Sequence, residues 1–333
     1  METVKLAGID RVASRIGLGT WALGGWMWGG ADDDTSMRTL LAAIDKGVTL
    51  IDTAPVYGFG RSEELVGRTL AEAGLRDQVV LSTKAGIDWR GETPFRNASR
   101  ARIEREVEDS LKRLRTEWID IYFVHWPDPL TPCSETAAAM HNLLKAGKIR
   151  SIGVSNFSPA QMDTMRELSP LHVAQPPYNL FERDIEADVL PYCRDNGVAT
   201  LTYGAICRGL LSGRMTAETA FEKGDLRRVD PKFRAPRYQQ YLAAVARLDA
   251  LARDRFGKSV IHLALRWVLD QPGVSVALWG ARSPGQLSPI DGALGWNLDA
   301  ETLAEIERIV AEEVSDPVGP EFMAPPDREH AAA

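Results

Sequence analysis

Four titratable side chains end, or closely follow, short apolar stretches of this chain. Asp52 follows Leu50 and Ile51, Tyr57 lies five residues further on, Lys84 ends the run that begins at Val79, and His125 follows residues 119–124. A lysine ammonium close to a phenol favours the phenolate, which predicts a Tyr57 pKa lowered from about 10 toward neutrality. A carboxylate keeps the ammonium charged, and a neutral imidazole can orient a carbonyl oxygen. The set therefore predicts proton transfer to an alkoxide as it forms from a carbonyl.

These side chains need a scaffold that brings several strand ends together. Apolar stretches that predict strands alternate along the chain with patterns that predict helices of 10 to 15 residues, which indicates parallel pairing. Eight such units in about 300 residues fit a single (β/α)8 TIM barrel, whose active sites lie at the carboxyl ends of the strands. The expected strands cover 15–20, 48–52, 79–84, 119–125, 149–155, 172–175, 199–203 and 274–278. The expected helices cover 34–46, 62–73, 99–114, 134–146, 158–168, 184–196, 238–256, 259–269, 284–294 and 299–313.

A doubly wound sheet is the alternative to the barrel. No Gly-x-Gly-x-x-Gly motif follows the first strand, since Gly17–Gly19 and Gly58–Gly60 are incomplete fragments of it. No linker divides residues 1–333, so we expect one domain. A small hairpin over residues 1–13 is expected to cap it, and the helices near the C-terminus are extra to the barrel. The Pro-rich tail from about 315 is expected to be poorly ordered or extended.

Composition excludes several classes of function. A net charge of -7 and a pI near 5.4 argue against a nucleic-acid surface. No apolar run is long enough to span a membrane, and the N-terminus lacks the pattern of a signal peptide, so a cytoplasmic protein is expected. The three cysteines and five histidines show no metal-ligand spacing. Serine-hydrolase chemistry lacks its Gly-x-Ser-x-Gly motif.

A second set of polar residues ends the later strands. Ser155 and Asn156 end the fifth strand, and Gln175 ends the sixth. Amide side chains supply both donors and an acceptor, which matches a carboxamide substituent. Tyr203 ends the seventh strand and offers a flat face to a flat ring. This half of the barrel mouth is therefore expected to bind an aromatic ring that carries an amide.

Together, Asp52, Tyr57, Lys84 and His125 resemble the catalytic tetrad of the aldo-keto reductase superfamily. The resemblance runs from about Ser14 to Ile309. The strings Gly-Thr-Trp-Ala-Leu-Gly-Gly-Trp-Met-Trp-Gly-Gly at 19–30 and Trp-Gly-Ala-Arg at 279–282 resemble the bacterial Shaker-type branch, especially its polyol and glycerol dehydrogenase members. The resemblance implies hydride transfer between a nicotinamide and a small aldehyde, ketone, polyol or alcohol, with Tyr57 as general acid and base.

The resemblance also implies a cofactor site for NADP(H), with NAD(H) as the alternative. Arg282 would pair with the 2'-phosphate, and Arg208 or Arg214 would neutralise the pyrophosphate. Residues 207–237 form a long polar insert that would fold over the cofactor. The implied cofactor-binding residues are Gly19, Thr20, Trp21, Asp52, Ser155, Asn156, Gln175, Tyr203, Gly204, Ala205, Cys207, Arg208, Gly209, Gly213, Arg214, Gly280, Ala281, Arg282 and Gln286.

The substrate site is expected beside the tetrad. The expected substrate residues are Tyr57 and His125 with three tryptophans, Trp21, Trp89 and Trp126, while Trp26 and Trp28 lie on the same predicted loops. The partner is then a small molecule, and an oligomer stays open. One rival comes from another class of function: the Shaker-type branch includes channel auxiliary subunits that bind the nicotinamide cofactor and turn over slowly. A barrel hydrolase or isomerase is a more distant third interpretation.

Overall fold

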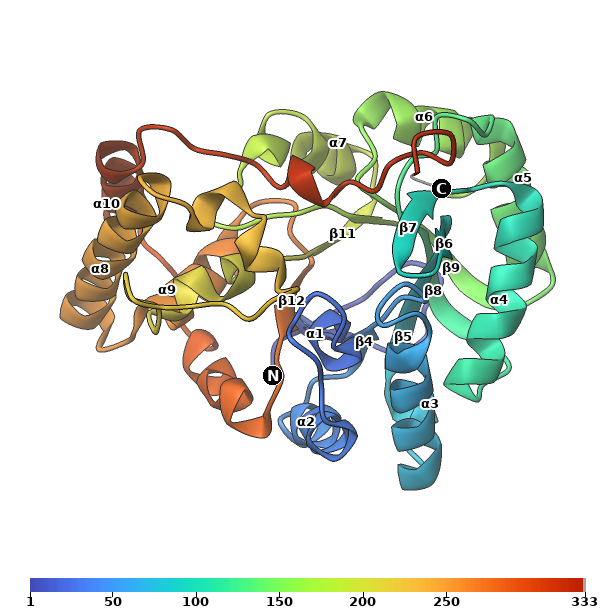
Figure 1. The fold of residues 1–333 in the computed structure, drawn as a ribbon, viewed down its shortest axis with the longest axis horizontal. Helices are drawn as coiled ribbons and strands as arrows, with labels where there is room; N and C mark the ends of the chain where they lie inside the picture. Colours follow the sequence, from blue (N-terminus) through green and yellow to red (C-terminus); the bar gives the residue numbers. More distant parts are fainter. Residues whose placement is uncertain (332–333) are drawn as a thin grey trace.

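Eight parallel strands close into a barrel in the computed structural model, which describes residues 1–331. Taken in sequence order, each barrel strand pairs with the one that follows it, and the last strand pairs with the first. Helices surround it (Figure 1). The expected (β/α)8 barrel is confirmed. The strands are β3 (Ile16–Gly19), β4 (Leu50–Asp52), β5 (Val80–Ala85), β8 (Ile119–Val124), β9 (Ile149–Ser155), β10 (Val173–Gln175), β11 (Ala199–Thr202) and β12 (Val276–Gly280).

The N-terminal hairpin closes the barrel's amino end. Strands β1 (Thr3–Val4) and β2 (Ala13–Ser14) pair antiparallel. Leu6 and Ile9, between them, are buried in the same apolar cluster as the barrel residues Leu50, Phe123 and Leu201. The cluster fills the barrel, so only the opposite mouth is free to bind a ligand.

Helices cover the outside of the barrel. Ser158 accepts a hydrogen bond from the backbone N–H of Gln161, whose side chain accepts one from the Ser158 N–H, and this capping box starts a helix with Pro159 at its first position. Gly67 lets two of the helices touch, because a Cβ there would lie 2.3 Å from the Arg113 carbonyl oxygen. The helices are α1 (Trp21–Gly24), α2 (Asp33–Asp45), α3 (Arg61–Ala73), α4 (Arg100–Leu114), α5 (Cys133–Lys145), α6 (Pro159–Leu168), α7 (Val189–Asp195), α8 (Arg237–Phe256), α9 (Val260–Asp270) and α10 (Ala300–Glu313).

Two segments differ from the secondary structure that the sequence predicts. The helix expected over 184–196 is divided into a 3-10 turn, Asp184–Glu186, and α7, because Asp188 has non-helical dihedral angles and caps α7 with its side chain. The loop expected around Trp89 is a hairpin of β6 (Ile87–Arg90) and β7 (Thr93–Arg96). Further 3-10 turns cover Arg76–Gln78, Cys207–Ser212, Leu226–Arg228, Pro231–Phe233, Pro284–Ala293 and Glu321–Met323.

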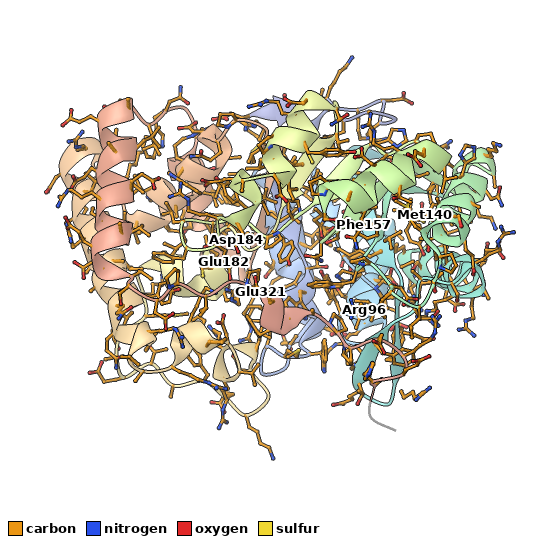
Figure 2. All side chains as sticks on the ribbon, turned by 90° about the horizontal axis from the view of Figure 1, so that it is seen from above. Arg96, Met140, Phe157, Glu182, Asp184 and Glu321 are labelled. Carbon is orange, nitrogen blue, oxygen red and sulfur yellow. The ribbon has the colours of Figure 1, made fainter. Side chains whose placement is uncertain are left out.

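The segment after α10 crosses the open mouth of the barrel. The sequence predicts a tail that is poorly ordered or extended, and the structure describes an extended segment with defined partners. It runs from α10 to the β6–β7 hairpin (Figure 1), and the backbone N–H of Arg96 donates to the Pro326 carbonyl over 2.8 Å. Figure 2, from above, shows Glu321 on this segment, with Glu182 and Arg96 on the elements that it passes. We call residues 315–331 the C-terminal strap.

Candidate active site

The four tetrad side chains meet at this mouth. Asp52 and Lys84 lie on neighbouring strands, and Lys84 Nζ donates to Asp52 Oδ2 over 2.7 Å and to the Thr53 carbonyl over 2.8 Å. Both side chains of the pair are buried, with 3% and 0% of the side chain exposed for Asp52 and Lys84. The Tyr57 ring lies 5.0 Å from Lys84 Nζ and 5.9 Å from the His125 ring, measured to the ring centres. The phenol, the ammonium and the imidazole therefore share one end of the barrel.

Two glycines fix the loop that carries Tyr57. A Cβ on Gly24 would lie 2.7 Å from the Tyr57 carbonyl oxygen, and one on Gly58 would lie 2.4 Å from the Gly24 carbonyl oxygen. Gly58 also has a φ of 68°, which disfavours other residues. The Trp21 ring stacks on the Tyr57 ring, with centres 5.8 Å apart and planes 17° apart. The backbone contact and the stacked ring together set where the phenol points.

The Tyr57 pKa differs from what the sequence predicts. Burial raises it well above its ordinary value of 10.0, and the charge of Asp52 raises it further. The expected lowering fails because Lys84 gives its charge and hydrogen bonds to Asp52 and Thr53, so little remains to stabilise a buried phenolate. Burial also lowers the pKa of Lys84 while Asp52 raises it. Burial, and then the Lys84 charge, lower the pKa of His125 well below 6.5, which agrees with the neutral imidazole expected there.

The polar residues of the second set are joined to the tetrad by hydrogen bonds. Gln175 Nε2 donates to Asp52 Oδ1 over 3.0 Å, and Ser155 Oγ donates to the Gln175 carbonyl over 2.8 Å. Asn156 has a φ of 62° and donates through Nδ2 to Ser155 Oγ and to the His125 carbonyl. Tyr203 Oη donates to Asn156 Oδ1 over 2.9 Å. One network therefore runs from Lys84 through Asp52 to the side chains expected to bind an amide.

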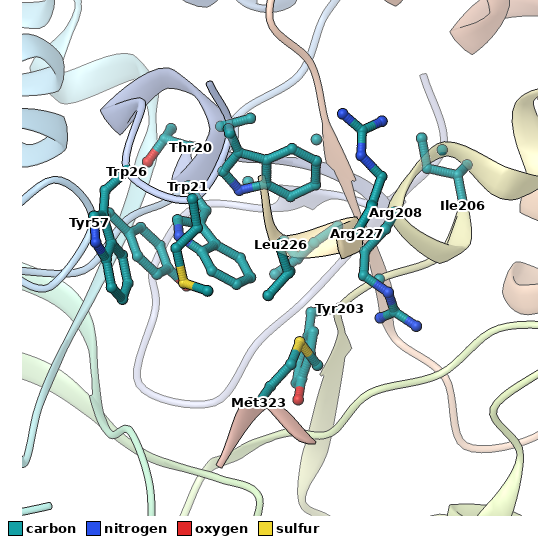
Figure 3. A pocket seen from close by; sticks show the side chains of 18 of the residues that line it. Thr20, Trp21, Trp26, Tyr57, Tyr203, Ile206, Arg208, Leu226, Arg227 and Met323 are labelled. Carbon is teal, nitrogen blue, oxygen red and sulfur yellow. The ribbon is translucent and has the colours of Figure 1, made fainter. Parts of the chain in front are cut away.

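A cavity of about 710 Å³ extends from the tetrad to Arg282. Figure 3 shows Trp21, Trp26 and Tyr57 on one side of it and Arg208 and Arg227 on the other. Most of the sequence-predicted residues line it: Gly19, Thr20, Trp21, Asp52, Tyr57, His125, Trp126, Ser155, Asn156, Gln175, Tyr203, Gly204, Ala205, Arg208, Gly209, Arg214, Gly280, Arg282 and Gln286.

Five predicted residues do not line the cavity. Cys207 and Ala281 are buried in the main apolar core. A Cβ on Gly213 would lie 2.8 Å from a side-chain carbon of Val260, so this glycine packs toward α9. Trp89, expected to contact substrate, lies on β6 and packs on Phe59 and under the Arg102 guanidinium. Lys84 is the fifth, because its side chain is fully buried against Asp52.

Arg208 lines the cavity, but its charge is already paired. Its Nε donates to Asp230 Oδ2 over 2.6 Å, and its guanidinium also pairs with Glu182. Lys232 Nζ lies 2.8 Å from the same Glu182 carboxylate, and all four side chains are at most 5% exposed. Two positive and two negative charges therefore balance within a buried cluster. Arg208 is a poor choice for neutralising a pyrophosphate, whereas Arg214 is exposed and lines the same cavity.

Several residues that line the cavity were not predicted from the sequence. The 207–237 insert contributes Leu226 and Arg227, and Arg227 lies over the Trp28 ring while its guanidinium pairs with Asp225. The β6–β7 hairpin contributes three residues, and the C-terminal strap contributes five. In the sequence the insert is polar and the tail is Pro-rich, and neither property identifies these lining residues. The hairpin and strap residues are Ile87, Thr93, Pro94, Phe322, Met323, Ala324, Pro325 and Pro326.

The chain belongs to the aldo/keto reductase family, because the model of that family matches residues 15–311. It is 61% identical to the aldo-keto reductase YhdN of Bacillus subtilis over 329 residues, which cover 99% of both chains. It is 35% identical to the NADH-specific methylglyoxal reductase of Escherichia coli, covering 92% of this chain and 98% of that protein. The family makes the protein an oxidoreductase that uses a nicotinamide cofactor.

Solved structures agree with this assignment. The glycerol dehydrogenase AKR11B4 from Gluconobacter oxydans is similar with a TM-score of 0.88 and 53% identity, covering 97% of this chain and 99% of that one. An aldo/keto reductase from Klebsiella pneumoniae, solved in complex with NADP and acetate, is similar with a TM-score of 0.71 and 30% identity, covering 92% and 95%. With the NADH-specific relative, this neighbour supports NADP(H), and NAD(H) as the alternative, as the cofactor.

Residues 1–331 contain no candidate metal site and no candidate membrane-spanning helix. No group of three or more His, Cys, Asp or Glu side chains within these residues is arranged to hold a metal ion. None of the helices formed by these residues combines the length and the apolar character needed to cross a membrane.

Proposed function

We propose that this protein is an NADP(H)-dependent oxidoreductase acting on small aldehydes, ketones, polyols or alcohols, with Tyr57 as the general acid and base. One observation carries the proposal. The Asp52 carboxylate holds Lys84 behind Tyr57 through Oδ2 and holds Gln175 of the amide-binding set through Oδ1. A single buried group thus fixes the proton-transfer side of the cavity relative to its cofactor side.

The residues of the cavity fit a nicotinamide cofactor. Ser155, Asn156 and Gln175 are suited to a carboxamide, and Tyr203 offers a ring face beside them. Gly204 and Gly209, both with positive φ, let the backbone approach a pyrophosphate, with Arg214 as its counter-charge. The exposed Arg282, on the loop after β12, is suited to a 2'-phosphate. When bound, the cofactor supplies or accepts the hydride.

The chain's own residues handle the proton. At neutral pH, Tyr57 keeps its proton because its pKa is raised, so it can donate to a carbonyl oxygen as negative charge grows there. His125 is neutral and donates an N–H to the same oxygen, which orients the carbonyl. In the reverse direction, Tyr57 must first lose its own proton, and the phenolate then accepts the proton of an alcohol. Lys84 and Asp52 stay as a charged pair and hold the loop and ring in place.

The cavity wall supports small substrates with apolar C–H faces. Trp21 stacks on Tyr57, and Trp26 and Trp126 pack in the same apolar cluster as Tyr57. Phe322 and Met323 of the strap also line the cavity, with the Phe322 ring 5.7 Å from the Arg208 guanidinium. Relatives carry names that point to three-carbon compounds: methylglyoxal reductase, L-glyceraldehyde 3-phosphate reductase and, among the structures, glycerol dehydrogenase. We therefore place a short aldehyde or polyol in this part of the cavity.

Steady-state consumption of NADPH tests the proposal. We expect purified protein to oxidise NADPH with methylglyoxal or glyceraldehyde and to reduce NADP⁺ with glycerol, and we expect Tyr57→Phe to lose both reactions. Nucleotide binding, followed by quenching of tryptophan fluorescence, is measured on the same samples. Tight binding without turnover of any tested compound would instead favour a nicotinamide-binding regulatory subunit.

A further inference from the structure

Of the contacts that hold the C-terminal strap, two lie on either side of its cavity-lining residues in the sequence. On the first side, Lys232 Nζ donates to the Gly319 carbonyl over 3.1 Å while it pairs with Glu182. On the other side, Arg328 holds the strap to the loop after β8. The residues that line the cavity, Phe322 to Pro326, lie between these two points. Neither Lys232 nor Arg328 lines the cavity, whereas the hydrogen bond from Arg96 N–H to the Pro326 carbonyl holds the lining segment directly.

Arg328 makes an anchor with several partners. Its Nη1 donates to Asp128 Oδ2 over 2.9 Å and lies 3.2 Å from both Asn97 Oδ1 and Thr131 Oγ1. Its Nη2 donates to the Leu130 carbonyl over 2.7 Å. The two nitrogens of one planar group thus reach side chains and a backbone carbonyl at once, a geometry that a single ammonium does not reproduce.

Asp128 gives this anchor its strength and its location. The carboxylate side chain is fully buried, and Arg328 is its one ion-pair partner within residues 1–331. Asp128 also accepts hydrogen bonds from the backbone N–H of Ala98 and from Thr131 Oγ1, so its position is fixed. It lies three residues after His125, on the loop that carries Trp126. The strap is therefore joined to the loop that follows the tetrad histidine.

We propose that Arg328 is a positioning residue for this reaction, which holds Phe322 to Pro326 as the wall against which the carbonyl substrate packs. The inference rests on the proposed function. Arg328 does not line the cavity, and the cofactor-side residues lie on other loops. Loss of the anchor therefore weakens substrate binding while the proton-transfer group Tyr57, fixed by Gly24 and Gly58, stays in place.

The test compares Arg328→Gln with Arg328→Lys and with a matched control, Arg308→Gln. Arg308 is also an ion-paired arginine near the C-terminal end, pairing with Glu305 and Glu312 on α10, and it does not line the cavity. For Arg328→Gln we expect the KM for methylglyoxal to rise roughly tenfold, with kcat within about twofold of wild type and the affinity for NADPH unchanged. Arg328→Lys is expected to recover part of the KM, and the control to match wild type.

Limited digestion with chymotrypsin follows the strap without using activity. Phe322 is the cleavage site of interest, and we expect faster cleavage there in Arg328→Gln than in wild type or the control. Faster cleavage with an unchanged KM would show that the strap is anchored by Arg328 but is not a substrate wall. Unchanged cleavage would refute the anchor itself. A wild-type protein without turnover would contradict the proposed function first, so the two failures are distinguishable.

Discussion

Lys84 Nζ lies 5.0 Å from the centre of the Tyr57 ring, yet it donates its hydrogen bonds to Asp52 and to the Thr53 carbonyl. The ammonium thus faces the ring of the phenol, and the adjacent carboxylate largely cancels its charge. In this arrangement Tyr57 remains a neutral acid. Such a group is suited to reducing a carbonyl at neutral pH, since its proton is present whenever the substrate arrives.

Replacing Tyr57 with Phe tests the acid directly. The ring and its stacking on Trp21 remain, and only the hydroxyl is lost. We expect kcat for carbonyl reduction to fall by roughly 10² to 10⁴, the range typical of general acid catalysis. NADPH binding, measured by fluorescence quenching, should stay within about twofold of wild type. A variant that keeps more than half of the wild-type rate would exclude Tyr57 as the proton donor.

The two directions of reaction should depend differently on pH. Because burial raises the Tyr57 pKa, the protonated form needed for reduction persists into alkaline solution. Because burial also lowers the His125 pKa, the neutral imidazole persists below pH 6.5. We expect kcat/KM for reduction to be level between about pH 6 and 9, while alcohol oxidation, which needs the deprotonated phenol, still rises at about pH 10. A loss of reduction with a midpoint near neutrality would indicate a lowered Tyr57 pKa.

The buried pair of Asp52 and Lys84 should be costly to break and cheaper to remove. Lys84→Met leaves the carboxylate buried without its cation, and we expect the free energy of unfolding to fall by about 3–5 kcal/mol, measured by urea denaturation. Asp52→Asn leaves the ammonium without its partner and also disturbs Gln175. The double variant should lose clearly less than the sum of the two single losses. Additive losses would show that the two charges do not stabilise each other.

Arg282 should govern the choice between the two cofactors. Its guanidinium is exposed on the loop after β12, where Nη2 donates to the Gly30 carbonyl over 3.0 Å. For Arg282→Gln we expect the KM for NADPH to rise roughly 10- to 100-fold, since a charge-assisted contact is lost, while the KM for NADH changes little. Arg214→Gln, by contrast, should weaken both cofactors alike, because the pyrophosphate is common to them. Equal losses for both cofactors in Arg282→Gln would place Arg282 away from the 2'-phosphate.

The ends of the barrel strands could be predicted from the sequence. Asp52, Lys84 and Gln175 each end or nearly end an apolar stretch, and parallel closure brings those ends to one mouth without further information. Short-range signals also located helix boundaries well, as at the capping box of Ser158 and Gln161. The barrel and the centre of the site are therefore predictable from local pattern.

Orientation within short elements was not predictable in the same way. Trp89 lies on a four-residue strand, where a one-residue change of register would move its side chain to the other face. Arg208 follows a glycine-rich stretch that suggests phosphate binding, but its partners Glu182, Asp230 and Lys232 come from other segments. The C-terminal strap has no periodicity, and its position depends on contacts formed only after the barrel exists. The positions of Trp89, Arg208 and the strap each depend on side-chain contacts with segments that are distant in the sequence.

The contact between Gly24 and Gly58 bears on how such an enzyme is redesigned. Any side chain at either position collides with backbone of the opposing loop, so substitutions there disturb the phenol before they alter the substrate range. The strap also lines this cavity, but it is not part of the barrel strands. Directed evolution for new substrates would therefore gain most from libraries over residues 322–326, where side chains can be exchanged while the catalytic loop keeps its shape.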